Sequence, residues 1–118
     1  MRSLAILVFA FIATTGAAHA DTLVGRWCDQ WIPVDPNSKS LIRIYETQTG
    51  SAYAQLVFYD GSEGRFPLNK SRKGEYRHVD SNTGDGYRIV GSGLEVFDNL
   101  GVIRVARRDA GSAASCAR

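Results

Sequence analysis

Histidine is the side chain that most often carries out acid–base chemistry near neutral pH, and this chain of 118 residues has two. His19 lies in an apolar leader, so His78 is the histidine left for the rest of the chain. One histidine cannot build a multi-histidine metal centre, and no G-x-S-x-G or comparable nucleophile setting accompanies it. We therefore expect no catalytic residues, no metal, no cofactor and no enzymatic activity. Catalysis by paired carboxylates is the open alternative, although no acid pair stands out by its spacing.

The stretch DSNTGDG, residues 80–86, contains oxygen ligands in an order that resembles a calcium loop, with Asp80, Asn82 and Asp85. Gly84 stands where the pattern requires a ligand, and Gly91 stands where the closing glutamate belongs. The stretch is therefore expected to be a hairpin turn.

The densest run of positive charge is NKSRKGEYR, with Lys70, Arg72, Lys73 and Arg77. It can be a solvated hairpin tip, or a patch that binds an anion or a partner. The full chain has a formal net charge of +2, and loss of a leader that contains Arg2 would reduce the excess to one. A chain so close to neutral is not expected to bind nucleic acid.

The first twenty residues have the order of a secretory signal: a positive charge, an apolar run and the small-residue end Ala18-His19-Ala20. We expect cleavage before Asp21 and a secreted or periplasmic protein. The apolar run is about half the length that a bilayer-spanning helix requires, so no membrane span is expected. Residues 21–118 are expected to form a single domain, which is small enough to need fastening beyond its core.

Two cysteines, Cys28 and Cys116, remain in a compartment where thiols oxidise, and we expect them to form a disulfide. The alternative is a pair of free thiols. Closing so long a loop corresponds to about 4 to 5 kcal/mol in chain-entropy estimates, which is an upper figure.

The chain after Asp21 consists of short alternating stretches separated by glycine and asparagine turns, which indicates an all-β fold. Glycines in the connections favour hairpins, so successive strands are expected to pair antiparallel. The predicted strands are Leu23–Ile32, Leu41–Gln48, Ala52–Tyr59, Arg65–Leu68, Glu75–Val79, Tyr87–Val90, Leu94–Phe97 and Val102–Arg107.

Seven or eight strands in an up-and-down order leave two exposed edges unless the sheet closes into a barrel. Cys28 lies in the first strand and Cys116 just beyond the last. Only closure makes those strands neighbours, so the expected disulfide and the expected barrel support each other.

The triplet Gly25-Arg26-Trp27 is a G-x-W at the start of the first strand. With the strand count and order, it resembles the signature of lipocalins and related calycin barrels. The resemblance implies that Trp27 closes the barrel floor and that an arginine near the end of the last strand packs across it. Arg104 and Arg107 are the candidates.

Strand alternation places Trp27, Asp29 and Trp31 on one face. If that face points inward, Asp29 needs a partner such as Arg43 or Arg104, because an unpaired buried charge is costly. The alternative is that strand irregularity brings Asp29 to the rim, where water solvates it. We expect the rim position.

Three functions compete at this stage. The first is a non-enzymatic, inhibitor-like module that binds an envelope or secreted protein, since the chain is similar in size and layout to bacterial inhibitors of secreted metalloproteases. The second is a carrier of a small apolar ligand inside the barrel, with Trp27 and Trp31 as the floor, and the third is the enzyme considered above. The sequence does not indicate an oligomeric state, a ligand or a target.

Overall fold

The computed structural model describes residues 20–32, 34–35, 37–109 and 116. This part of the chain contains eight strands and no helix, so the predicted all-β fold is confirmed. Each predicted strand overlaps one observed strand. The strands are β1 (Thr22–Gln30), β2 (Lys39–Glu46), β3 (Ala52–Phe58), β4 (Glu63–Arg72), β5 (Glu75–His78), β6 (Gly86–Val90), β7 (Gly93–Asp98) and β8 (Gly101–Arg108).

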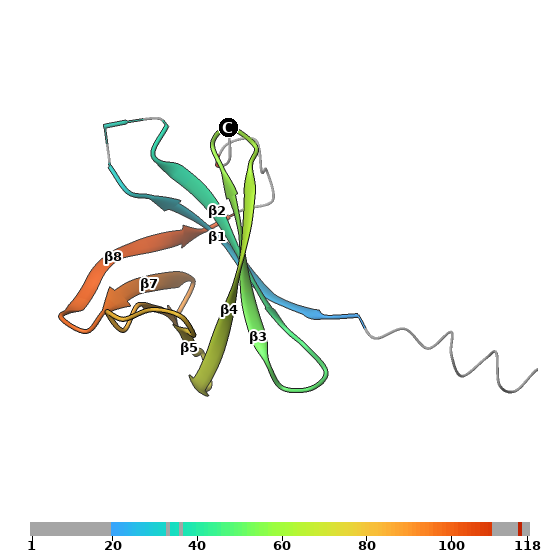
Figure 1. Ribbon diagram of the computed structural model, residues 1–118. Coiled ribbons are helices and arrows are strands. Elements are labelled where there is room, and N and C mark those ends of the chain that lie inside the picture. Colours follow the sequence, from blue (N-terminus) through green and yellow to red (C-terminus); the bar gives the residue numbers. More distant parts are fainter. Residues whose placement is uncertain (1–19, 33, 36, 110–115, 117–118) are drawn as a thin grey trace, which may run out of the picture.

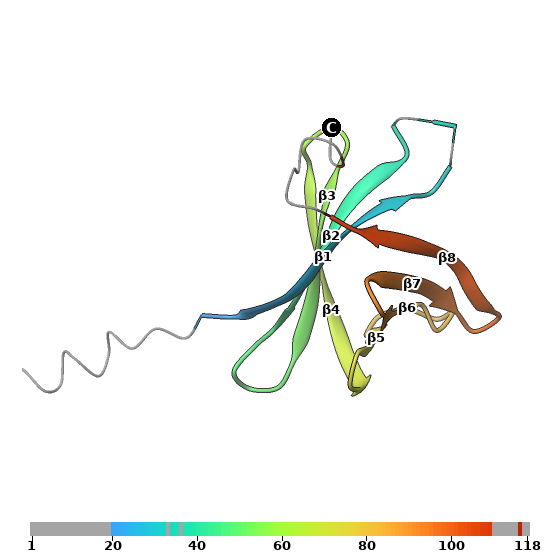
Figure 2. The same cartoon turned by 180° about the vertical axis from the view of Figure 1, so that it is seen from behind.

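The strands form a closed barrel in which every neighbouring pair is antiparallel and follows chain order. The barrel closes where β8 pairs with β1. The predicted up-and-down barrel is therefore confirmed, with eight strands. In Figure 1, β5–β8 curve to the left of β1–β4, and in Figure 2 they appear on the right.

The two ends of the barrel differ in their connections. We call the end where β1 begins the base; it carries residues 47–51, 73–74 and 91–92. We call the opposite end the mouth; it carries residues 31–38, 59–62, 79–85 and 99–100.

Strand pairing is uneven around the barrel. β1 and β8 pair only through Trp27↔Arg108 and Cys28↔Arg107, and the β4–β5 ladder begins at Leu68. The β4–β5 pairing lies toward the base, and the β1–β8 pairing joins the base end of β8 to the second half of β1. The strands β1–β4 meet the strands β5–β8 at two seams, β1–β8 and β4–β5. In the described part of the chain, both seams therefore have few backbone contacts near the mouth.

The core explains the glycine of the G-x-W triplet. Trp27 is fully buried, and a Cβ placed on Gly25 would overlap the six-membered ring of its indole. The indole can lie flat over the strand only because position 25 has no side chain. The other buried members of the cluster are all aliphatic or aromatic: Ile42, Ile44, Ala52, Ala54, Leu68, Tyr76, Tyr87, Leu94, Val96 and Ala106.

The expected disulfide is present between Cys28 and Cys116, whose Cα atoms are 5.5 Å apart. Just after β8, the Asp109 amide donates to the Arg26 carbonyl oxygen at 3.0 Å, and its carboxylate pairs with the Arg26 guanidinium at 2.7 Å. These contacts tie the chain beyond β8 back to β1. Residues 1–19, which make up nearly all of the expected signal peptide, lie outside the described residues. The described residues include no helix long and apolar enough to cross a membrane.

Candidate functional site

An ion pair inside the barrel spans the β1–β8 seam near the mouth. The Arg104 guanidinium donates from Nε to Asp29 Oδ1 at 2.6 Å and from Nη2 to Asp29 Oδ2 at 2.8 Å. Asp29 is 3% exposed. The expectation that Asp29 lies at the solvated rim is therefore wrong: strand alternation holds through position 29, and a two-pronged arginine satisfies the inward carboxylate.

His78 and Tyr87 lie beside this ion pair and contact each other. His78 Nε2 is 3.1 Å from the Tyr87 hydroxyl, and the two rings are 5.1 Å apart. Burial lowers the pKa of His78, although the negative charge of Asp85 opposes the shift. Burial, followed by the charge of Asp29, raises the pKa of Tyr87. At neutral pH the pair is therefore uncharged, which suits contact with apolar groups.

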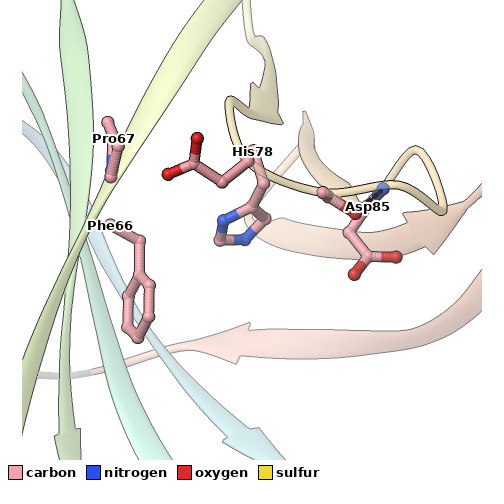
Figure 3. A pocket seen from close by; sticks show the side chains of 6 residues that line it. Phe66, Pro67, His78 and Asp85 are labelled. Carbon is pink, nitrogen blue, oxygen red and sulfur yellow. Dashed lines mark hydrogen bonds between the residues drawn. The ribbon is translucent and has the colours of Figure 1, made fainter.

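Two open pockets meet at His78. One has a volume of about 340 Å³ and lies against Phe66, Pro67 and the 79–85 connection. Figure 3 shows the His78 imidazole between the Phe66 ring and the Asp85 carboxylate. The other pocket has a volume of about 280 Å³ and extends toward Ile103. Together they make the interior of the mouth partly aromatic and partly polar.

Some of the side-chain oxygen atoms of the 79–85 connection accept hydrogen bonds from within the connection itself. Asp85 Oδ1 accepts from the Thr83 hydroxyl at 2.7 Å, and Ser81 Oγ accepts from the amides of Thr83 and Asp85. Among the described residues, no group of three or more His, Cys, Asp and Glu side chains is placed to hold a metal ion.

The mouth connections carry exposed large hydrophobic side chains among polar ones, whereas the base connections carry no exposed large hydrophobic side chain. Leu100 is 91% exposed and Val34 is 89% exposed, each at the tip of a mouth connection. The base connections consist of Thr, Gln, Ser, Lys and Gly residues. Eight of the large hydrophobic side chains that are exposed in the described chain lie in the mouth connections or at the first positions of β8: Trp31, Ile32, Val34, Tyr59, Val79, Leu100, Val102 and Ile103.

The arginine that lies over Trp27, the predicted floor residue, is one that the sequence did not indicate. The guanidinium of Arg108 lies 5.2 Å from the Trp27 ring, and the indole nitrogen donates to the Ser92 carbonyl oxygen at 3.2 Å. Arg104 instead pairs with Asp29, and Arg107 is exposed and opposite Cys28 in the ladder. Arg108 contacts the ring because it lies directly opposite Trp27 in the β1–β8 register.

Trp31 does not join Trp27 at the floor. It follows the last residue of β1, is 40% exposed and makes an edge contact with Phe58, with ring centroids 6.2 Å apart. Its place is on the mouth, at the end opposite the start of β1.

The structure divides the four cations predicted to form a patch among different neighbours. Lys70 pairs with Glu46 at 2.9 Å, while Arg72 and Arg77 approach Glu75 at 3.3 and 4.0 Å. Lys73 lies in the β4–β5 turn and makes no ion pair with a described residue. Three of the four cations thus have an acidic neighbour, although Arg72 and Arg77 share Glu75 with a further arginine, Arg88.

Glu75 is the centre of an outer-wall network that sequence reasoning missed. Its side chain is 3% exposed and also accepts from Arg88 at 2.9 Å, and Arg88 pairs in turn with Glu95. A hydrogen bond from the Ser71 hydroxyl, followed by those from Arg88 and Arg72, lowers the pKa of Glu75 to about 2. Opposite charges at paired positions of β5, β6 and β7 were the available signal.

Comparison of the chain with protein-family models, with curated proteins and with solved structures finds no match.

Proposed function

We propose that this protein is a secreted, non-enzymatic module that binds a protein partner with the apolar rim of its mouth. The observation that carries the proposal is the contrast between the two ends of the barrel. Exposed Trp, Ile, Val, Leu and Tyr side chains occupy all four mouth connections, while the base connections have none of the large hydrophobic side chains that are exposed. Exposed large hydrophobic side chains that gather at one end of a domain favour an interaction site there.

The composition of the rim also favours a protein partner. Trp31 and Tyr59 combine large contact area with a polar atom, and these residue types are enriched where proteins meet. The Asp29–Arg104 pair and the His78–Tyr87 contact lie behind the rim and hold the mouth strands in place. Such support reduces the ordering cost of binding.

The interior supports a partner at the mouth better than a ligand carried inside the barrel. The positions around Trp27 are filled by side chains of the barrel itself, such as Ile42, Leu68 and Leu94. A carrier that uses Trp27 and Trp31 as its floor would also need the two indoles at the same end, and they are at different ends.

The lipocalin-like resemblance fits the observed barrel and points to a secreted enzyme as the class of partner. In the metalloprotease inhibitors that the chain resembles, a free N-terminal segment enters the protease. Here four residues, Asp21 to Val24, would precede Gly25 after leader removal, and they lie at the base. We therefore assign partner binding to the mouth connections.

The test is recovery of a partner from the envelope fraction of the producing cell, followed by titration of purified variants. Leu100→Asp and Val34→Asp should each weaken binding about tenfold or more, because a carboxylate in a desolvated rim has no partner. Val90→Asp is the matched control, since Val90 is 51% exposed and lies beside the base connection 91–92. Equal weakening by Val90→Asp, or absence of any saturable partner, would overturn the proposal.

A further inference from the structure

A pocket at the base, separate from the mouth, has the chemistry of a ligand site. Its volume is about 450 Å³, and its walls come from β1, β2, β4, β5 and β6 and from the β4–β5 turn. We infer that this pocket binds a small amphipathic carboxylate, with the apolar chain against the pocket wall and the carboxylate at Lys73.

Part of the wall is apolar and packs against the core. Val24 and Ile89 are partly buried and pack on the core, and Tyr76 is 1% exposed. Gly74, at φ 77°, lets the turn fold back so that the Ile89 amide donates to its carbonyl oxygen at 2.8 Å. A short hydrocarbon chain could therefore be taken out of water without rearranging the backbone.

The charges at the pocket leave one cation available. Glu46 Oε2 accepts from the Tyr76 hydroxyl at 2.7 Å and from the Lys70 ammonium at 2.9 Å. Lys70 and Glu46 therefore balance each other. Lys73, the remaining charged group of the lining, makes no ion pair with a described residue. The rim of the pocket has one surplus positive charge.

That balance selects the class of ligand. A single ammonium matches a monoanion, while a dianion would also face the Glu46 carboxylate. A cationic ligand would be repelled by the Lys73 ammonium. A neutral alcohol would contact the apolar wall but would form no ion pair with Lys73. The hydrocarbon part adds affinity in proportion to the apolar area that it covers.

The experiment is an amide NMR titration of the oxidised protein with sodium octanoate, kept below its micelle concentration, with 1-octanol and octylammonium as comparison ligands. Octanoate should shift the amides of Val24, Gly74, Tyr76 and Ile89 saturably and bind about fivefold or more tightly than the other two compounds. Lys73→Gln should weaken octanoate about fivefold to tenfold. Arg107→Gln is the control, because it removes an exposed charge from the outer wall of β8, and it should leave the affinity unchanged.

Three results would overturn the inference: no saturable shift with octanoate, equal affinity for octylammonium, or shifts centred on Phe66 and His78 at the mouth. The spectrum of each variant reports its own folding, so a misfolded protein would be recognised directly. The ligand pocket and the proposed partner site are at opposite ends of the barrel. A negative octanoate result would therefore not contradict the partner site, and absence of a partner would not contradict the ligand pocket.

Discussion

At the scale of single residues, two of the nearly buried carboxylates in the described chain lie on barrel strands and are neutralised from other strands. Asp29 on β1 meets Arg104 on β8, and Glu75 on β5 meets Arg88 on β6. A buried charge is tolerated when its partner and its hydrogen bonds are both present. The two sites have different roles in the fold: one spans a seam near the mouth, and the other joins four strands, β4 to β7, on the outer wall.

Removal of the Asp29 carboxylate should be strongly destabilising. Asp29→Ala leaves the Arg104 guanidinium, which is 31% exposed, without its anion, and should lower the free energy of unfolding by about 2 to 4 kcal/mol. Urea unfolding followed by fluorescence measures the change. The double variant Asp29→Leu with Arg104→Met should recover at least half of the loss, because it removes both charges together. A single variant as stable as the parent protein would contradict this role.

Glu75 should make the protein less stable in acid. Its pKa is about 2 in the folded state, below the usual 4.5, so its contribution is complete above pH 4.5 and disappears as the pH falls toward 2. Glu75→Gln should reduce the slope of the unfolding free energy against pH in that range. The reduction should correspond to at most about one proton fewer taken up on unfolding. Urea titrations at a series of pH values give the slope. An unchanged slope would show that Glu75 has the same pKa in the folded and the unfolded protein.

At the scale of elements, β1 is the strand on which closure depends. It pairs with β2 along its length, pairs with β8 at two positions, carries Trp27 inside and carries Cys28 outside. Gly25 is needed for this arrangement because the Trp27 ring lies over it. A change at either position should therefore affect the whole barrel.

Gly25→Ala should lower the free energy of unfolding by about 1 to 3 kcal/mol, because its methyl group must displace the Trp27 indole. Thermal unfolding gives the measurement. Thr22→Ala, at the exposed start of the same strand, is the control and should change the stability by less than about 0.5 kcal/mol. Similar values for both variants would mean that the indole has room to move.

The disulfide should contribute more than any single core contact. Replacement of both Cys28 and Cys116 by Ser opens a loop with a sequence separation of 88 and should cost about 2 to 5 kcal/mol. Chemical denaturation of the double variant, compared with reduced and oxidised parent protein, measures this. If the three proteins have the same midpoint, the bond does not restrain the unfolded chain.

The local alternation of the sequence was enough to predict the strands, whereas most contacts of the candidate site depend on the register of strand pairing. Alternation and turn residues predicted all eight strands, although β4 extends two residues earlier and four residues later than expected. The Asp29–Arg104 pair joins residues 75 positions apart, and the β7–β8 pairing contains an irregularity at Val96/Phe97. Such irregularities determine which arginine of GVIRVARR faces which strand, and they leave no clear mark in the sequence.

At the scale of the whole molecule, the barrel has two unlike ends. The mouth combines an apolar rim with two pockets around His78, and the base combines polar turns with the pocket beside Lys73. Because an up-and-down barrel places alternate connections at opposite ends, each end can acquire its own surface without disturbing the other. This separation would allow the proposed partner site and the inferred ligand site to act independently in one small domain.

The most direct test of the partner site is photo-crosslinking in the producing cell, with a photoreactive amino acid placed at Leu100 on the mouth or at Val90 near the base. Both positions are exposed and apolar, so they sample the two ends equally well. We predict a discrete crosslinked protein of defined mass from position 100 and none from position 90. The same product from both positions, or no product from position 100, would contradict the assignment of the mouth as the partner-binding face.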